Sequence, residues 1–110
     1  AQSFSVTAEI DYRRGYAVLV NSKEETDFAR QVGVELVGGE KVTLQGPGVT
    51  GSEDFGYMLE KRPGCYLLVG NGDGDKHGAC MVHNPGYDFN DENVAVGGAY
   101  WMLLAKRYLV

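Results

Sequence analysis

The sequence has few cysteines, no cluster of basic residues and no long apolar segment, and each absence excludes a class of protein. Cys65 and Cys80 are the only cysteines, too few for the disulfide framework of a small secreted protein. No CxxC pair is present, which excludes a structural zinc knuckle. The two residues are therefore interpreted as buried thiols of a cytoplasmic protein, with a disulfide between them as the alternative.

Charge and hydropathy limit the partners in the same way. The 110 residues carry a net charge of -5 and do not cluster Lys with Arg, so we expect no nucleic-acid partner. The longest apolar runs, such as residues 99–105, are far shorter than the roughly 20 residues of a membrane helix, so we expect no membrane partner. The first residue is Ala1, which fits either loss of an initiator Met or excision from a longer protein.

The chain does contain an alternation of strand-like and helix-like segments. Every second residue is apolar over residues 4–12, and the apolar stretch 16–20 follows, so both segments are predicted to be strands. Ser22 followed by Glu25 matches a capping box, which predicts the start of a helix. Helical spacing of apolar residues continues up to Gly38, where the helix is expected to end.

The pattern continues in the second half. A short strand is predicted at residues 41–45, and Ser52 is predicted to cap a helix whose first turn holds Glu53 and Asp54. The apolar run 65–69 is typical of a strand buried on both faces.

A long glycine-rich loop over residues 70–90 then leads to a last helix, predicted at residues 93–109. Small and apolar residues share one face of that helix and predict close packing: Val94, Ala95, Gly98, Ala99, Met102 and Ala105. The alternation as a whole indicates an α/β fold that forms part of a larger layered domain.

A glycine-rich motif at residues 46–51 matches GxGxxG between a predicted strand and a predicted helix, the context of a dinucleotide site. Pro47 removes an amide that would face the pyrophosphate, and two acidic residues at the following helix would repel it. A strand-to-helix turn is therefore the favoured interpretation, and nucleotide binding is kept as a minor alternative.

Residues 71–75 resemble the start of a calcium loop, but Lys76 and Val82 stand where an EF-hand needs Gly and Glu, so a polar turn is predicted. His83 lies in the middle of the same long loop. Imidazole is a common ligand of divalent metals, although an isolated loop histidine is more often a surface residue.

Three segments carry a specific resemblance: GSEDF (51–55), PGCYLLVGNGDGD (63–75) and VHNPGYDFND (82–91). Together and in this order, they resemble the hippurate hydrolase and N-acyl-amino-acid amidohydrolase family, a branch of the aminoacylase and carboxypeptidase-like metallopeptidases. RRGYAVLVN (13–21) is similar to the family's junction between its lid and catalytic domains, except that Ala17 stands where a Pro is expected.

The resemblance implies a three-layer catalytic domain of sheet and helices, interrupted by a lid domain that often mediates dimerisation. Residues 1–20 would be the last lid strand and the end of that domain, and residues 21–110 the C-terminal part of the catalytic domain. The implied reaction is hydrolysis of a small-molecule N-acyl amino acid at two divalent metal ions, with zinc or manganese expected. A homo-oligomer is also implied.

The family's last histidine ligand maps onto His83, and its GSEDF segment lies near the site. Ser52, Glu53 and Asp54 are therefore candidate residues of a substrate loop or of the support around the metals, whereas His77 matches no ligand. The other ligands and the catalytic glutamate lie upstream in the family. We therefore expect the isolated chain to be inactive without that N-terminal segment. The alternative function is a non-catalytic binding or assembly module.

Overall fold

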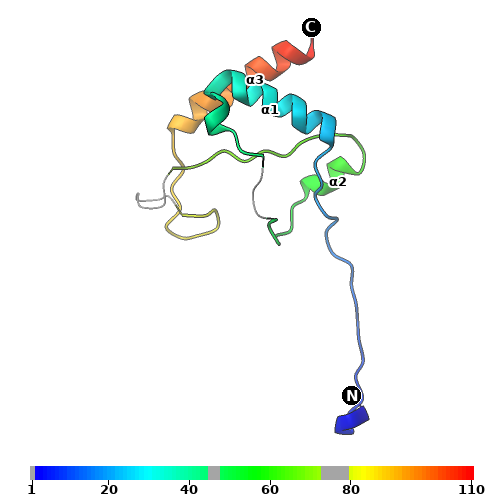
Figure 1. Cartoon of the computed structure of the whole chain (residues 1–110). Helices are drawn as coiled ribbons and strands as arrows, with labels where there is room; N and C mark the ends of the chain where they lie inside the picture. The colour runs from blue at the N-terminus through cyan, green and yellow to red at the C-terminus, as the bar shows by residue number, and fades with distance from the viewer. Residues whose placement is uncertain (1, 45–47, 73–79) are drawn as a thin grey trace.

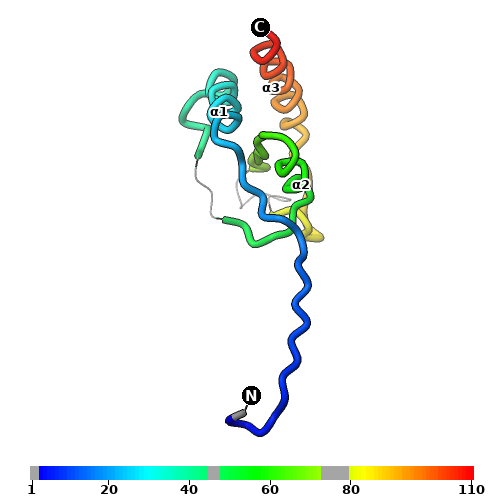
Figure 2. The backbone as a smooth tube through the Cα atoms, turned by 90° about the vertical axis from the view of Figure 1, so that its right-hand side faces the viewer, coloured from blue at the N-terminus to red at the C-terminus, as the bar shows by residue number. Residues whose placement is uncertain are grey.

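The computed structural model describes residues 2–44, 48–72 and 80–110 (Figure 1). Its regular elements are η1 (Gln2–Phe4), α1 (Lys23–Val37), η2 (Gly39–Lys41), α2 (Phe55–Leu59) and α3 (Glu92–Tyr108). An extended arm, residues 5–21, joins η1 to α1 and projects away from the helices (Figures 1 and 2). The principal extents of 65 × 38 × 20 Å reflect that arm.

The predicted α/β fold, with its partial three layers of sheet and helix and a lid strand, is wrong for the part of the chain that the structure describes. That part contains helices and loops but no β-strand. Segments 4–12, 16–20 and 65–69 form no strand, and residues 39–41 form a 3₁₀ turn where a strand was predicted to begin. A strand needs a neighbour with which to exchange backbone hydrogen bonds, whereas apolar alternation reports only which face would be buried.

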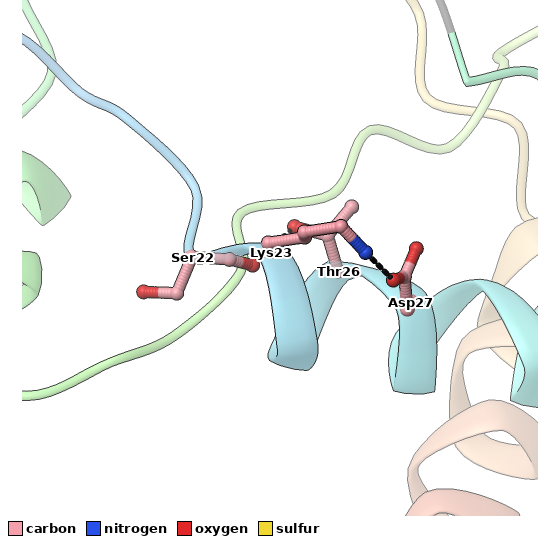
Figure 3. Close-up of polar contacts among 4 residues, drawn as sticks. All are labelled: Ser22, Lys23, Thr26 and Asp27. Atoms are coloured by element: carbon pink, nitrogen blue, oxygen red, sulfur yellow. Dashed lines mark hydrogen bonds and ion pairs between the residues drawn. The ribbon is translucent and has the colours of Figure 1, made fainter.

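Helix α1 begins where the sequence predicts, but not through the predicted capping box. Ser22 occupies the N-cap with ψ 138°, yet its hydroxyl makes no capping hydrogen bond. The Ser22 carbonyl instead accepts from the backbone N–H and the hydroxyl of Thr26, at 2.9 and 2.7 Å. Figure 3 shows this first turn, where Lys23 forms a 2.6 Å ion pair with Asp27 that lowers the pKa of the Asp27 carboxyl. The helix ends at Gly38, whose φ of +89° suits glycine.

Helices α1 and α3 lie side by side (Figure 2). The Tyr100 hydroxyl donates to the Ala29 carbonyl at 3.0 Å, and Arg107 forms an ion pair with Glu35. Ala29 and Val32 are the only apolar residues that are buried within the described ranges. The core of this chain is therefore a short seam between two helices.

Helix α3 matches its predicted range to within one residue, but the partner predicted for its small-residue face is not found among the described residues. Val94 and Met102 on that face are 64% and 70% exposed, and a Cβ at Gly98 would have no neighbour within 4 Å. The opposite face, which carries Tyr100, packs against α1 instead. Within the described residues, this face is exposed except at Ala99, which is half-buried.

Large apolar side chains are exposed over much of the described chain. On the arm, the exposed fraction reaches 86% at Ile10 and 83% at Val18. On α3, Trp101 is 68% exposed. Exposed apolar surface of this extent marks surfaces that contact another part of a protein or a partner. Among the described residues, no helix combines the length and the apolar character needed to cross a membrane.

Candidate functional site

Glu53 is the best-anchored of the three predicted residues in the Gly51–Phe55 segment. One of its carboxylate oxygens accepts from the Phe55 backbone N–H at 3.1 Å, and the other accepts from the Tyr66 hydroxyl at 3.0 Å. The Phe55 N–H, followed by side-chain hydrogen bonds, lowers the pKa of Glu53. The hydrogen bond to Glu53 in turn raises the pKa of Tyr66. The pair therefore consists of an ionised carboxylate and a neutral phenol at neutral pH.

Ser52 and Asp54 flank this anchored residue and are exposed. The prediction that Ser52 caps the helix is wrong, because α2 begins at Phe55 with Asp54 in the N-cap position. The three residues thus precede the helix rather than form its first turn. A carboxylate that bonds the N–H two residues ahead is a local alternative to helix, which explains the later start.

Tyr66 is itself held by the side chain of Asn21. The Asn21 amide donates to the Tyr66 carbonyl at 2.9 Å and accepts from the Tyr66 N–H at 2.8 Å. Next to this pair, the Ser22 N–H donates to the Gly64 carbonyl at 2.9 Å, and the Gly64 N–H donates to the Ser22 hydroxyl at 3.1 Å. Four hydrogen bonds therefore join Asn21, at the end of the arm, and Ser22, the N-cap of α1, to the start of the segment that carries Tyr66.

Helix α2 packs onto the arm at a position that only glycine fits closely. A Cβ on Gly56 would lie 3.2 Å from the Ala17 carbonyl oxygen and 3.7 Å from the Leu19 Cα, so a side chain there would press on backbone. The rings of Tyr16 and Tyr57 pack beside this contact with centroids 5.6 Å apart. The arm, α2 and the Tyr66 segment thus meet in one place.

His83 lies in a separate loop that consists of two successive turns. The Asn84 N–H donates to the Met81 carbonyl at 3.2 Å, and the Tyr87 N–H donates to the Asn84 carbonyl at 2.9 Å. His83 is exposed and adopts φ +70°, at the third position of the first turn. Positive φ is uncommon outside glycine, and such residues cluster at functional sites.

The end of this loop is tied to the Tyr66 segment by Asn71. Its amide donates to the Asp88 carbonyl at 2.7 Å and accepts from the Asn90 N–H at 2.8 Å. The Asn93 amide adds a bond to the Gly70 carbonyl at 3.0 Å. The two segments that resemble the amidohydrolase family, 63–75 and 82–91, are therefore joined where the structure describes them.

The described residues do not by themselves fit a metal centre. No group of three or more His, Cys, Asp or Glu side chains in residues 2–44, 48–72 and 80–110 is placed to hold an ion. His83 supplies one imidazole, whereas a catalytic zinc site takes three protein ligands. His77 and parts of the motifs at 46–51 and 71–75 lie outside the described residues. Cys65 and Cys80 form no disulfide, in agreement with the interpretation as thiols, but they are half-buried rather than buried.

Reasoning from sequence named Glu53 as a candidate, but it did not name Tyr66, whose hydroxyl bonds Glu53, or Asn21, which bonds the backbone of Tyr66. Asn21 stands directly before the predicted helix cap, where an amide is able to satisfy a donor and an acceptor of another segment together. The sequence gives no sign of which segment that is.

Residues 5–107 match the peptidase family M20/M25/M40. The hippurate hydrolase of Campylobacter jejuni is 31% identical over 109 residues, which is 99% of this chain and 27% of that protein. The IAA-amino acid hydrolase ILR1-like 2 of Arabidopsis thaliana is 34% identical over 90 residues, 82% of this chain and 20% of that protein.

A probable hydrolase of Synechocystis, sll0100, is 25% identical over 107 residues, 97% of this chain and 27% of its own length. No solved structure matches. This chain therefore spans between a fifth and about a quarter of the length of these relatives. The resemblance of segments 51–55, 63–75 and 82–91 is confirmed, and the chain belongs to the peptidase family M20/M25/M40.

Proposed function

We propose that this chain is the C-terminal part of a metal-dependent amidohydrolase that hydrolyses N-acyl amino acids, and that it is inactive by itself. The observation that carries the proposal is the match to a hippurate hydrolase, which covers 99% of this chain but 27% of that protein. Hippurate and IAA-amino acid conjugates, the substrates in the relatives' names, are amides between an acyl group and an amino acid. The reaction class follows from that shared chemistry.

His83 is proposed as a ligand of one of two divalent ions, zinc or manganese, in the complete active site. Its exposed side chain and its constrained turn support this role, because both leave the imidazole available to groups outside the described residues. The remaining ligands and the catalytic base would come from the part of the relatives that this chain does not cover. Ser52, Glu53 and Asp54 are proposed to lie near the substrate or to support the metal ligands.

The exposed arm supports a division at its junction with α1. Residues 1–20 are proposed as the end of a lid and dimerisation domain, and residues 21–110 as part of the catalytic domain of a cytoplasmic homo-oligomer. The apolar side chains at Ile10 and Val18 are exposed, which favours contact with a segment or subunit that is not part of this chain.

The same exposed surfaces favour a second candidate function, a non-catalytic module for binding or assembly. The arm is extended and exposes apolar side chains such as Ile10 and Val18, and exposed apolar surface favours association with other chains. In that case the chain would associate with copies of itself or with a partner, and would need no metal.

The two candidates are separated by assaying hippurate hydrolysis with the 110-residue chain and with the product of the complete reading frame from which it is translated. We expect the longer protein to hydrolyse hippurate with bound divalent metal, and the chain alone to be inactive. Hydrolysis by the chain alone would contradict the proposal. A metal-free, inactive product that forms a dimer stable to dilution would favour the assembly module.

A further inference from the structure

We propose that Asn21 and Tyr66 are positioning residues that hold Glu53, and with it the segment Gly51–Phe55, in a fixed place beside the substrate. This inference rests on the proposed function, in which that segment lies near the active site. It adds two residues that the resemblance did not mark and gives each of them a specific task.

The physical basis is an unbroken series of hydrogen bonds between three segments that are distant in sequence. Asn21 bonds both backbone groups of Tyr66, at 2.9 and 2.8 Å. The Tyr66 hydroxyl donates to Glu53 at 3.0 Å, and Glu53 accepts from the Phe55 N–H at 3.1 Å. Each bond orients the next group, so a change at Asn21 is transmitted to the backbone at the start of α2.

Packing restricts the same groups. The rings of Tyr66 and Phe55 lie with their centroids 5.4 Å apart, which limits where the phenol is able to point. Glu53 is half-buried, and the Tyr66 hydroxyl bonds its second carboxylate oxygen. The contact of Gly56 with the backbone of Ala17 adds a third restraint from the arm. The segment is thereby held at Glu53 and at the start of α2 that follows it.

Asn21 also lies at the proposed boundary between the lid part and the catalytic part. Because it bonds Tyr66 directly, movement of the arm relative to the helices would disturb the position of Glu53. The amide is the side chain suited to this task, because it donates and accepts at the same time. An aspartate of the same shape would accept from the Tyr66 N–H but would have no donor for the carbonyl.

The test uses the complete enzyme with Tyr66→Phe, and Tyr57→Phe as the matched control. Tyr57 is an exposed tyrosine two residues beyond Phe55 whose ring packs on Tyr16, so its variant loses the same oxygen atom without touching Glu53. We expect Tyr66→Phe to raise KM about 10-fold, in line with loss of a hydrogen bond to a charged group, with a smaller change in kcat. Metal content should stay as in the unmodified enzyme.

The contact itself is read out with 3-fluorotyrosine incorporated throughout the enzyme and followed by fluorine NMR. The resonance that is absent in Tyr66→Phe assigns Tyr66, and Glu53→Gln should shift its titration to lower pH. A Tyr66 titration unaffected by Glu53→Gln would overturn the proposal, as would a KM in Tyr66→Phe equal to that of Tyr57→Phe.

Asn21→Ala and Asn21→Asp test the first link in the same enzyme. We expect both to raise KM and to move the Tyr66 titration, because neither donates to the Tyr66 carbonyl. If Asn21→Asp kept full activity and the Tyr66 titration did not move, the Asn21 amide would not be needed to position Tyr66, and the proposal would be contradicted. If the complete enzyme hydrolysed no N-acyl amino acid, that result would contradict the proposed function only. The fluorine titrations would still decide whether Asn21 and Tyr66 hold Glu53.

Discussion

The side-chain amide of Asn21 exchanges two hydrogen bonds with the backbone of Tyr66, 45 residues further along the chain. Neighbouring strands normally exchange such bonds between backbones, and here one side chain takes the place of a strand. The contact joins the end of the extended arm to the segment that holds Glu53. It is the link between the fold of this chain and its candidate site.

Asn21→Ala should therefore lower the free energy of unfolding by about 1–3 kcal/mol, because both backbone groups of Tyr66 lose their partner. Asn93→Ala is the matched control, since the Asn93 amide makes a single bond to the Gly70 carbonyl. Urea unfolding followed by circular dichroism measures both. A loss in Asn21→Ala no larger than the loss in Asn93→Ala would contradict the assigned importance of the contact.

The seam between α1 and α3 gives a second prediction. Val32 is 2% exposed, whereas Val34 on the same helix is 37% exposed. Truncation of the buried side chain leaves a cavity, so Val32→Ala should lower the free energy of unfolding by about 2 kcal/mol. Val34→Ala should lower it by clearly less. The urea concentrations at the midpoint of unfolding are compared for the two variants. Equal midpoints would contradict the assignment of Val32 to the core.

Two glycine substitutions should change the stability of the chain in opposite directions. Gly98→Ala adds a methyl group on the open face of α3 and should stabilise the 110-residue chain by about 0.5–1 kcal/mol, because alanine favours helix. Gly56→Ala should destabilise it, since the added Cβ would meet the Ala17 carbonyl at 3.2 Å. Thermal unfolding compares the two variants.

Destabilisation by Gly98→Ala would show that the face is covered, for instance by association of two chains. Thermal unfolding at several protein concentrations shows whether two chains associate, because the unfolding temperature of a dimer rises with concentration.

The pair of Glu53 and Tyr66 gives a dependence on pH. The lowered pKa of Glu53 means that its contribution to stability is present above its ordinary value of 4.5 and is lost as pH falls through the lower folded value. The raised pKa of Tyr66 works in the other direction. Its contribution is present below the ordinary value of 10.0 and is lost as pH rises through the higher folded value.

Unfolding of the unmodified protein and of Glu53→Gln across the pH range checks both signs. The two proteins should differ most at neutral pH and converge in acid and in strong alkali. A difference in stability that stays constant with pH would contradict the hydrogen bond between the two side chains.

The two long helices were predictable because their signals are local. The residues that end α1 at Gly38 and the periodic pattern of α3 lie within the helices or next to them. The strand predictions failed for the opposite reason. A strand at residues 4–12 or 65–69 depends on a neighbouring strand that the local pattern does not reveal. The apolar residues were recognised correctly, but the geometry that would bury them was not.

The candidate site shows the same division. Glu53 became a candidate through a motif, whereas Tyr66 and Asn21 did not, because the Tyr66–Glu53 and Asn21–Tyr66 contacts span 13 and 45 residues. The hydroxyl of Ser22 was expected to cap its own helix and is used by the Gly64 N–H instead. The capping motif correctly marks the start of α1, but a tertiary contact determines which group bonds the Ser22 hydroxyl.

The most direct test of the central proposal compares His83→Ala with His77→Ala in the complete enzyme, since His77 is the other histidine of these 110 residues. Divalent metal per active site and the rate of hippurate hydrolysis are measured for both. We expect His83→Ala to lose bound metal and to lower the rate by about 100-fold or more, as expected for loss of a metal ligand, and His77→Ala to keep both. Full metal content and an unchanged rate in His83→Ala would contradict the role of His83 as a metal ligand.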